Sequence, residues 1–121
     1  MAKHNILGEK GECLAQDYLI NKGYQVLATN WRFKKLELDI IAYKSGVICF
    51  VEVKTRRNHI FGEPEQALTL QKQKNILLAA QEFIESQHVD ADVRFDLITV
   101  IHSESEQKLV HYEDVFQPFL F

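Results

Sequence analysis

The sequence is poor in several residue types, and each scarcity excludes a class of protein. Two cysteines in 121 residues, far apart in the chain, fit no metal-binding spacing. Two prolines and five glycines leave no low-complexity tract or inter-domain linker. No apolar run approaches the roughly 20 residues that span a bilayer, and no apolar signal-peptide core follows the first residues. We therefore expect a cytoplasmic protein without membrane association, with Cys13 and Cys49 reduced and in the core.

The sequence also lacks an excess of positive charge, because its net charge is −3. This balance argues against a protein that coats nucleic acid through charge alone. The charges are unevenly placed, however. Residues 1–60 hold ten Lys and Arg against six Asp and Glu, whereas residues 61–121 hold four against eleven. Cations around an acidic centre in the first half suit a phosphodiester substrate, and the alternative is that they are solvated strand ends.

The length and the hydrophobic pattern predict one domain, residues 1–121, with an α/β fold. Periodicity and turn residues predict helices at 5–22 and 64–86 and strands at 24–33, 37–43, 47–55, 94–101 and 109–112. The order helix–strand–strand–strand–helix–strand–strand implies a mixed sheet of about four to five strands. Short connections make the first three strands antiparallel, and the long helix makes a parallel crossover to the fourth.

Three charged residues interrupt strands that should be wholly apolar. Asp39 lies inside the run 36–43, and Glu52 and Lys54 lie inside the run 47–56. Because a buried charge is costly when unpaired, such groups need a partner or a metal. Two neighbouring carboxylates offer the hard oxygen ligands that Mg²⁺ or Mn²⁺ prefers, and a nearby lysine can orient water or stabilise negative charge. The alternative is a buried ion-pair network without a metal.

The register of the hairpin between these two runs decides between those interpretations. A two-residue turn at Ser45 and Gly46 would place Asp39 opposite Glu52, with both carboxylates on one face. A three-residue turn would pair Asp39 with Val51 and place the two acids on opposite faces. A metal site requires the first register or an equivalent one.

An acid in one strand followed by Glu-Val-Lys in the next resembles the PD-(D/E)xK nuclease motif, although the proline of that motif is absent. Over about residues 5 to 116 the sequence also resembles the YraN-like family of small bacterial proteins, whose function is unassigned. The resemblance implies a restriction-endonuclease-like three-layer core, similar to that of Holliday-junction resolvases. It rests on Gly8-Glu9, Gly11-Glu12, Ala15, Leu19, Gly23-Tyr24, Asn30-Trp31-Arg32, Glu37 to Ala42, Phe50 to Arg56, Phe61-Gly62, Lys72, Arg94-Phe95-Asp96 and Val115-Phe116.

The resemblance implies a role for each matching charged residue. Asp39 and Glu52 would bind Mg²⁺ or Mn²⁺, and Lys54 would assist the attacking water, so that these three form the catalytic set. Glu12 would reach the metal directly or through water. Glu37 would support the site, although Leu36 stands before it where the family usually has glycine.

Further charged residues are expected around this centre. Arg56 and Lys72 match basic positions of the family and would contact phosphate, and Arg32, which precedes the charged strands, is a third candidate. Asp96 is expected to be structural and paired with Arg94 or with a helix group.

The function predicted from these residues is a divalent-metal-dependent endonuclease acting on DNA, with branched or damaged DNA as candidate substrates. The alternative is a non-catalytic module that binds nucleic acid or protein on the same fold, because the chain as a whole is acidic. The apolar tail Phe119-Leu120-Phe121 must pack on the domain or meet a partner. A homodimer formed through it would suit a two-fold DNA junction.

Overall fold

The computed structural model describes residues 6–58 and 64–117. The tail Phe119-Leu120-Phe121 and the segment 59–63 therefore lie outside the described residues. The elements follow the predicted order of helices and strands, which confirms the α/β class. They are α1 (Ile6–Asn21), β1 (Gln25–Phe33), β2 (Leu36–Lys44), β3 (Val47–Arg56), α2 (Pro64–Ala67), α3 (Leu70–Ser86), β4 (Asp92–His102) and β5 (Gln107–Tyr112).

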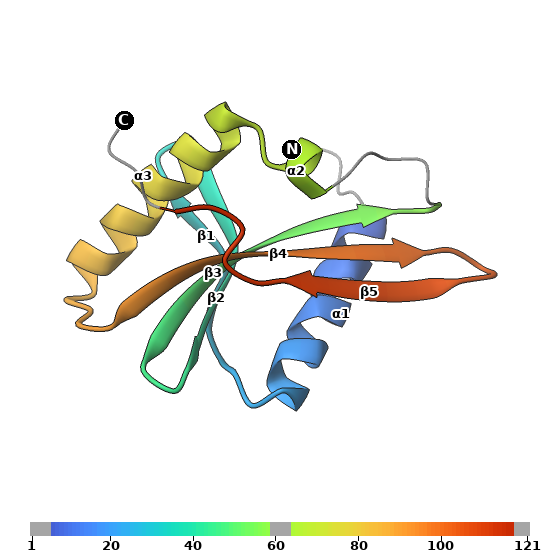
Figure 1. Ribbon diagram of the computed structural model, residues 1–121, viewed down its shortest axis with the longest axis horizontal. Helices are drawn as coiled ribbons and strands as arrows, with labels where there is room; N and C mark the ends of the chain where they lie inside the picture. Colours follow the sequence, from blue (N-terminus) through green and yellow to red (C-terminus); the bar gives the residue numbers. More distant parts are fainter. Residues whose placement is uncertain (1–5, 59–63, 118–121) are drawn as a thin grey trace.

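One mixed sheet carries all five strands, in the spatial order β1-β2-β3-β4-β5 (Figure 1). Neighbouring strands pair antiparallel except β3 and β4, which are parallel. The chain passes between those two strands through α2 and α3, as the crossover rule predicts. Among the described residues, no helix is long and apolar enough to span a membrane.

The two long helices cover opposite faces of the sheet, which gives the three layers expected of this fold (Figure 1). The α3 face buries one apolar cluster, which includes Leu38, Ile41, Phe50, Ile76, Phe83, Phe95 and Leu97. The α1 face buries a second, which includes Ala15, Leu19, Ile40, Cys49, Val51, Ile98 and Val100. Strand side chains alternate between the faces, so consecutive residues such as Phe50 and Val51 belong to different clusters.

Two sequence-based expectations were wrong in detail. The single helix predicted at 64–86 is divided into α2 and α3. Thr69 has an extended backbone, and its side chain accepts a hydrogen bond from the Lys72 N–H, so it caps the start of α3. Cys13 is exposed, whereas Cys49 is buried as expected. The buried stripe of α1 is Gly11, Ala15 and Leu19, and position 13 lies away from that stripe.

Gly11 is a point of close approach between α1 and the sheet. A β-carbon built at this position would overlap the Thr55 side chain of β3, with the Thr55 Cβ and Cγ2 atoms only 2.8 Å away. Glycine is ordinarily unfavourable inside a helix. Here it permits a backbone approach that sets the height of α1 over β3.

We expect Gly11→Ala to lower the free energy of unfolding by about 1–3 kcal/mol, since the added methyl group forces α1 away from β3. Chemical denaturation measures the loss. The double variant Gly11→Ala, Thr55→Gly tests the cause, because removing the Thr55 side chain should recover part of the loss. If the two substitutions have strictly additive effects, the contact between α1 and Thr55 is not the reason for the glycine.

Candidate active site

The hairpin of β2 and β3 has the register that places the two acids together. Its turn contains two residues, Ser45 and Gly46, with φ values of 51° and 81°. Two positive φ values are typical of the type I′ turn that joins twisted strands. The pairing runs from Lys44–Val47 to Ile40–Val51. Asp39 and Glu52 are the next positions beyond this last pair, so of the two registers left open by the sequence the structure has the one with a two-residue turn.

Asp39 lies at an irregularity in β2, where the alternation of side chains between the two faces of the sheet is interrupted. Leu38 packs in the α3-side cluster, although Ile40, two positions further, packs in the α1-side cluster. Regular alternation would place both on one face. At this irregular point the Asp39 Oδ2 atom accepts a hydrogen bond of 2.9 Å from the Val53 N–H of β3. The carboxylate therefore occupies the fork where β2 and β3 cease to pair.

Glu52 projects from β3 toward the α3 face and is only 8% exposed. Its Oε2 atom lies 2.7 Å from the Nζ atom of Lys72, which α3 supplies from its first turn. Burial would normally exclude a carboxylate unless a charged partner is present. The structure thus brings Glu52 and Lys72 together from elements that are distant in sequence.

The two carboxylates at the fork repel one another. Burial, together with the negative charge of Glu52, raises the pKa of Asp39 to about 7. The Val53 N–H and the Lys72 ammonium oppose this rise without cancelling it. Burial alone would lower the pKa of Lys72, but Glu52, Asp39 and Glu37 together raise it above its ordinary value. The fork is therefore a place of excess negative charge around one ammonium group.

Glu12 reaches the same region from α1 and is held by Asn30 of β1. The Asn30 Nδ2 atom donates a hydrogen bond of 3.0 Å to Glu12 Oε1. Burial raises the pKa of Glu12, and the neighbouring charges of Asp39, Glu37 and Glu9 add to the rise against the Asn30 hydrogen bond. Within residues 6–58 and 64–117, however, no three Asp, Glu, His or Cys side chains converge closely enough to hold a metal. Glu12 is a neighbour of the Asp39–Glu52 pair, not a third member at ligand distance.

The remaining predicted residues, Arg32, Arg56 and Lys54, differ in their contacts. Arg32 forms an ion pair of 3.4 Å with Glu37, and its side chain is 68% exposed. Arg56 Nη1 donates to the carbonyl of Thr55 at the end of β3. Lys54 is half-buried, and in the described part of the chain its side chain forms no hydrogen bond or ion pair.

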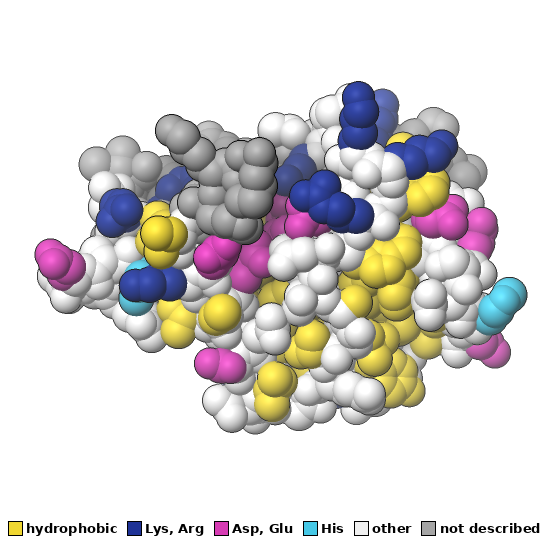
Figure 2. Space-filling model, turned by 180° about the vertical axis from the view of Figure 1, so that it is seen from behind, with side chains coloured by type: hydrophobic (Ala, Val, Ile, Leu, Met, Phe, Trp, Pro, Cys, Tyr) yellow, Lys and Arg dark blue, Asp and Glu magenta, His cyan; other side chains and the backbone are white. Residues whose placement is uncertain are grey.

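The charges are also grouped on the molecular surface. Figure 2 shows Asp and Glu side chains gathered near the middle of one face, with Lys and Arg side chains beside them. An acidic patch bordered by cations attracts a metal ion at its centre and tolerates a polyanion at its border.

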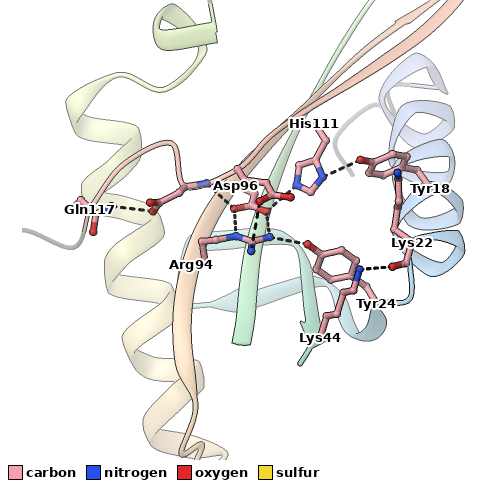
Figure 3. Close-up of polar contacts among 10 residues, drawn as sticks. Tyr18, Lys22, Tyr24, Lys44, Arg94, Asp96, His111 and Gln117 are labelled. Carbon is pink, nitrogen blue, oxygen red and sulfur yellow. Dashed lines mark hydrogen bonds and ion pairs between the residues drawn. The ribbon is translucent and has the colours of Figure 1, made fainter. Parts of the chain in front are cut away.

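A second buried carboxylate, Asp96 of β4, has the opposite electrostatic situation (Figure 3). Its side chain is fully buried and receives Arg94 through two nitrogen atoms at 2.8 and 2.9 Å. His111 Nε2 lies 2.7 Å away, and the Asp114 N–H donates from 3.0 Å. Burial alone would raise the pKa of Asp96, but these partners lower it below its ordinary value. The prediction of a structural Asp96 paired with Arg94 is confirmed.

The same network ties distant elements to one another. Tyr18 OH of α1 lies 3.1 Å from His111 Nδ1 of β5. Arg94 Nη2 of β4 donates to Tyr24 OH, just before β1, at 2.7 Å. Figure 3 shows these side chains converging on Asp96 from both sides. A carboxylate satisfied in this way holds the α1 face of the sheet together.

Sequence reasoning assigned no role to Asn30 or to His111. Asn30 has a positive φ of 49° inside β1, and asparagine is among the residues that tolerate this conformation. An asparagine inside a predicted strand was a usable signal. His111 gave no comparable signal, because its partner Asp96 is 15 residues away in sequence and only the pairing of β4 with β5 brings them together.

Comparison with known proteins finds relatives along the whole chain. The sequence profile of the Uncharacterised protein family UPF0102 matches residues 11–100. A UPF0102 protein of Flavobacterium psychrophilum is 43% identical over 119 residues, covering 98% of this chain and 100% of the relative. One from Bacteroides fragilis is 43% identical over 121 residues and covers 100% of both chains. One from Christiangramia forsetii is 39% identical over 116 residues, covering 96% and 98% respectively.

The raised pKa of Asp39 predicts a pH-dependent stability. Between its unfolded value of 3.8 and its folded value of about 7, the folded chain keeps a proton that the unfolded chain has lost. Stability therefore falls as pH rises through this window. Asp39→Asn removes that loss, and we expect it to raise Tm at about pH 8 by about 4 °C or more. The Tm values are measured with a chelator present. At about pH 4 the gain in Tm of Asp39→Asn over the wild type should be largely absent. Asp92→Asn, at an exposed position on β4, is the matched control. A gain of equal size at both pH values would contradict the charge argument.

Asp96→Asn should behave in the opposite way. The amide group would leave the Arg94 and His111 donors without a full set of acceptors, so we expect a loss of about 3–5 kcal/mol in the free energy of unfolding at neutral pH. Urea denaturation measures it. A change of less than about 1 kcal/mol would mean that the network contributes little to stability.

Proposed function

The chain belongs to the uncharacterised protein family UPF0102, and from this premise and the arrangement of its carboxylates we propose that it is a divalent-metal-dependent endonuclease that hydrolyses phosphodiester bonds in DNA. The membership confirms the resemblance to the YraN-like family. The observation that carries the proposal is the pair Asp39 and Glu52, held side by side at the fork with the pKa of Asp39 raised to about 7. Perturbed carboxylates of this kind are a sign of a functional site.

The donor set fits Mg²⁺ or Mn²⁺. Both ions prefer oxygen ligands, and Mg²⁺ needs only one or two carboxylates because it keeps several water molecules. Asp39 and Glu52 would supply those two carboxylates. Glu12, fixed by Asn30, would bind the hydration shell. When bound, the ion would polarise the scissile phosphate and lower the pKa of a water molecule.

The chain's own residues would do the rest. Lys54 follows Glu52 by two positions on β3 and shares its face. Its ammonium has no partner among the described residues, so it is suited to orient the attacking water or to stabilise developing negative charge. Glu37 would keep Arg32 at the rim of the site. Arg32, Arg56 and Lys72 would contact phosphates on either side of the scissile bond. Such contacts position the strand without reading its sequence.

DNA, including branched DNA, is the proposed partner, and the activity would be exercised in the cytoplasm. A homodimer would present two such sites to a two-fold junction. The proposed substrate rests on the acidic centre and the surrounding cations, since a metal at the centre would turn a repulsive surface into an attractive one for phosphate.

A second function is favoured by one observation. Lys72 already neutralises Glu52, and in the described residues no third ligand completes the pair. A domain with this arrangement could bind nucleic acid or protein without cutting. Binding that persists in EDTA and survives Glu52→Gln would indicate this module.

Cleavage of labelled DNA tests the proposal directly. Linear, flapped and four-way DNA, with a single-stranded RNA for comparison, would be incubated with the protein in Mg²⁺ or Mn²⁺. We expect cleavage that EDTA abolishes, and Asp39→Asn and Glu52→Gln should each lower the rate by about 100-fold or more. Asp92→Asn should keep the wild-type rate. Absence of cleavage on every substrate, together with absence of metal binding in titration calorimetry, would refute the proposal.

A further inference from the structure

Lys72 occupies a position that the helix itself disfavours. Its backbone N–H donates to the capping Thr69 side chain, so it lies in the first turn of α3. The first turn carries the positive end of the helix dipole, where a cation is unfavourable. A capping threonine is commonly followed, three residues later, by Glu or Gln, and the first turn of α3 contains no acidic residue. The reason for a lysine here must lie outside the helix.

That reason is the carboxylate pair at the fork. The Lys72 ammonium lies 2.7 Å from Glu52 Oε2, and its other charged neighbours are Asp39 and Glu37. The Glu52 side chain is 9% exposed, whereas that of Lys72 is 45% exposed. Lys72 therefore approaches from the solvent side on a flexible stem, and its cationic end reaches the place where the negative charge is concentrated.

An ammonium in this position offsets the negative charge of the carboxylate pair, as a bound metal ion would. Both are cations attracted by the negative charge of Glu52, and a cation already at Oε2 repels a second one that approaches the same carboxylate. Glu52 is fixed on a central strand, but Lys72 can leave, because its half-exposed side chain gains solvent as it moves away.

We propose that Lys72 is an exchangeable counter-ion, which holds Glu52 in the metal-free protein and is displaced when a divalent cation binds Asp39 and Glu52. The inference rests on the proposed function, since it requires the fork to bind a metal. It differs from a simple phosphate contact, because it assigns Lys72 a competing role in the metal-free state. It also separates the two lysines, since Lys54, unlike Lys72, is not engaged with the carboxylates beforehand.

Titration calorimetry with Mn²⁺ tests the exchange. Lys72→Met keeps the length of the apolar stem and removes the competing charge, so we expect Mn²⁺ to bind about fivefold more tightly, or more, than to the wild type. Lys74→Met, which removes the same charge two residues along α3, should bind within about twofold of the wild type. Lys72→Gln, which can still donate a hydrogen bond to Glu52, should show an intermediate gain and serves if Lys72→Met does not fold.

Thermal unfolding supplies an independent readout. Without metal, Lys72→Met should have a lower Tm than the wild type, because Glu52 loses its partner. Saturating Mn²⁺ should raise the Tm of Lys72→Met by more than it raises that of the wild type, since the ion no longer has to displace an ammonium. If Lys72 only held α3 on the sheet, Lys72→Met would lower the Tm by the same amount with and without the ion.

The outcomes separate the inference from the function on which it rests. Wild-type binding of Mn²⁺ with equal or weaker binding by Lys72→Met and Lys72→Gln would overturn the exchange and leave the metal site standing. No binding by the wild type or by either variant would instead remove the proposed metal site. Binding by the variants alone would support the exchange in its strongest form, in which Lys72 excludes the ion.

Discussion

The repulsion between two carboxylates at the fork of β2 and β3 is the constraint on which the candidate site depends. Asp39 and Glu52 lie side by side because a two-residue turn fixes the register of their hairpin. Neither acid is free to move to solvent, since each is carried by a central strand between two helical layers. The fold therefore holds negative charges together that would separate in a flexible chain, and it retains them at some expense of stability.

A further buried carboxylate, Asp96, has the hydrogen-bond partners that Asp39 lacks. Asp96 receives four donors from Arg94, His111 and the Asp114 backbone, and its pKa is lowered. Asp39 receives one backbone donor, and its pKa is raised. The two carboxylates lie in the same sheet, yet one is saturated with partners and the other is left short of them. Because of that contrast, we interpret Asp96 as structural and propose Asp39 as the acid that binds a ligand.

The helices contribute to the site in unequal ways. Gly11 lets α1 approach β3, which brings Glu12 near the fork. Thr69 ends the preceding loop and starts α3 at the point where Lys72 can reach Glu52. Local features of two helices, a glycine and a cap, thus decide which charges surround the fork. Neither feature is catalytic by itself, but both position the groups that are proposed to act.

Much of the architecture followed from local pattern, because strand alternation, short turns and the crossover rule act over a few residues. These rules predicted the element order and the mixed sheet, and they reduced the register between Asp39 and Glu52 to two alternatives. They failed at 68–69, where Thr69 caps a new helix. A threonine inside an apolar periodic run does not by itself predict that one helix ends and another begins. They failed also for Cys13, which is exposed because the buried stripe of α1 runs along Gly11, Ala15 and Leu19 and leaves position 13 outside it.

The sequence by itself determined that charged residues interrupt apolar strands, and the cost of burying charge made those residues candidates for a site. Only the tertiary structure decided which partner each charge has. Lys72 reaches Glu52 across 20 positions of sequence (72 − 52). Asn30 reaches Glu12 across 18 positions, and His111 reaches Asp96 across 15. Such contacts depend on how the helices lie on the sheet and how the strands twist, and no local pattern encodes those distances.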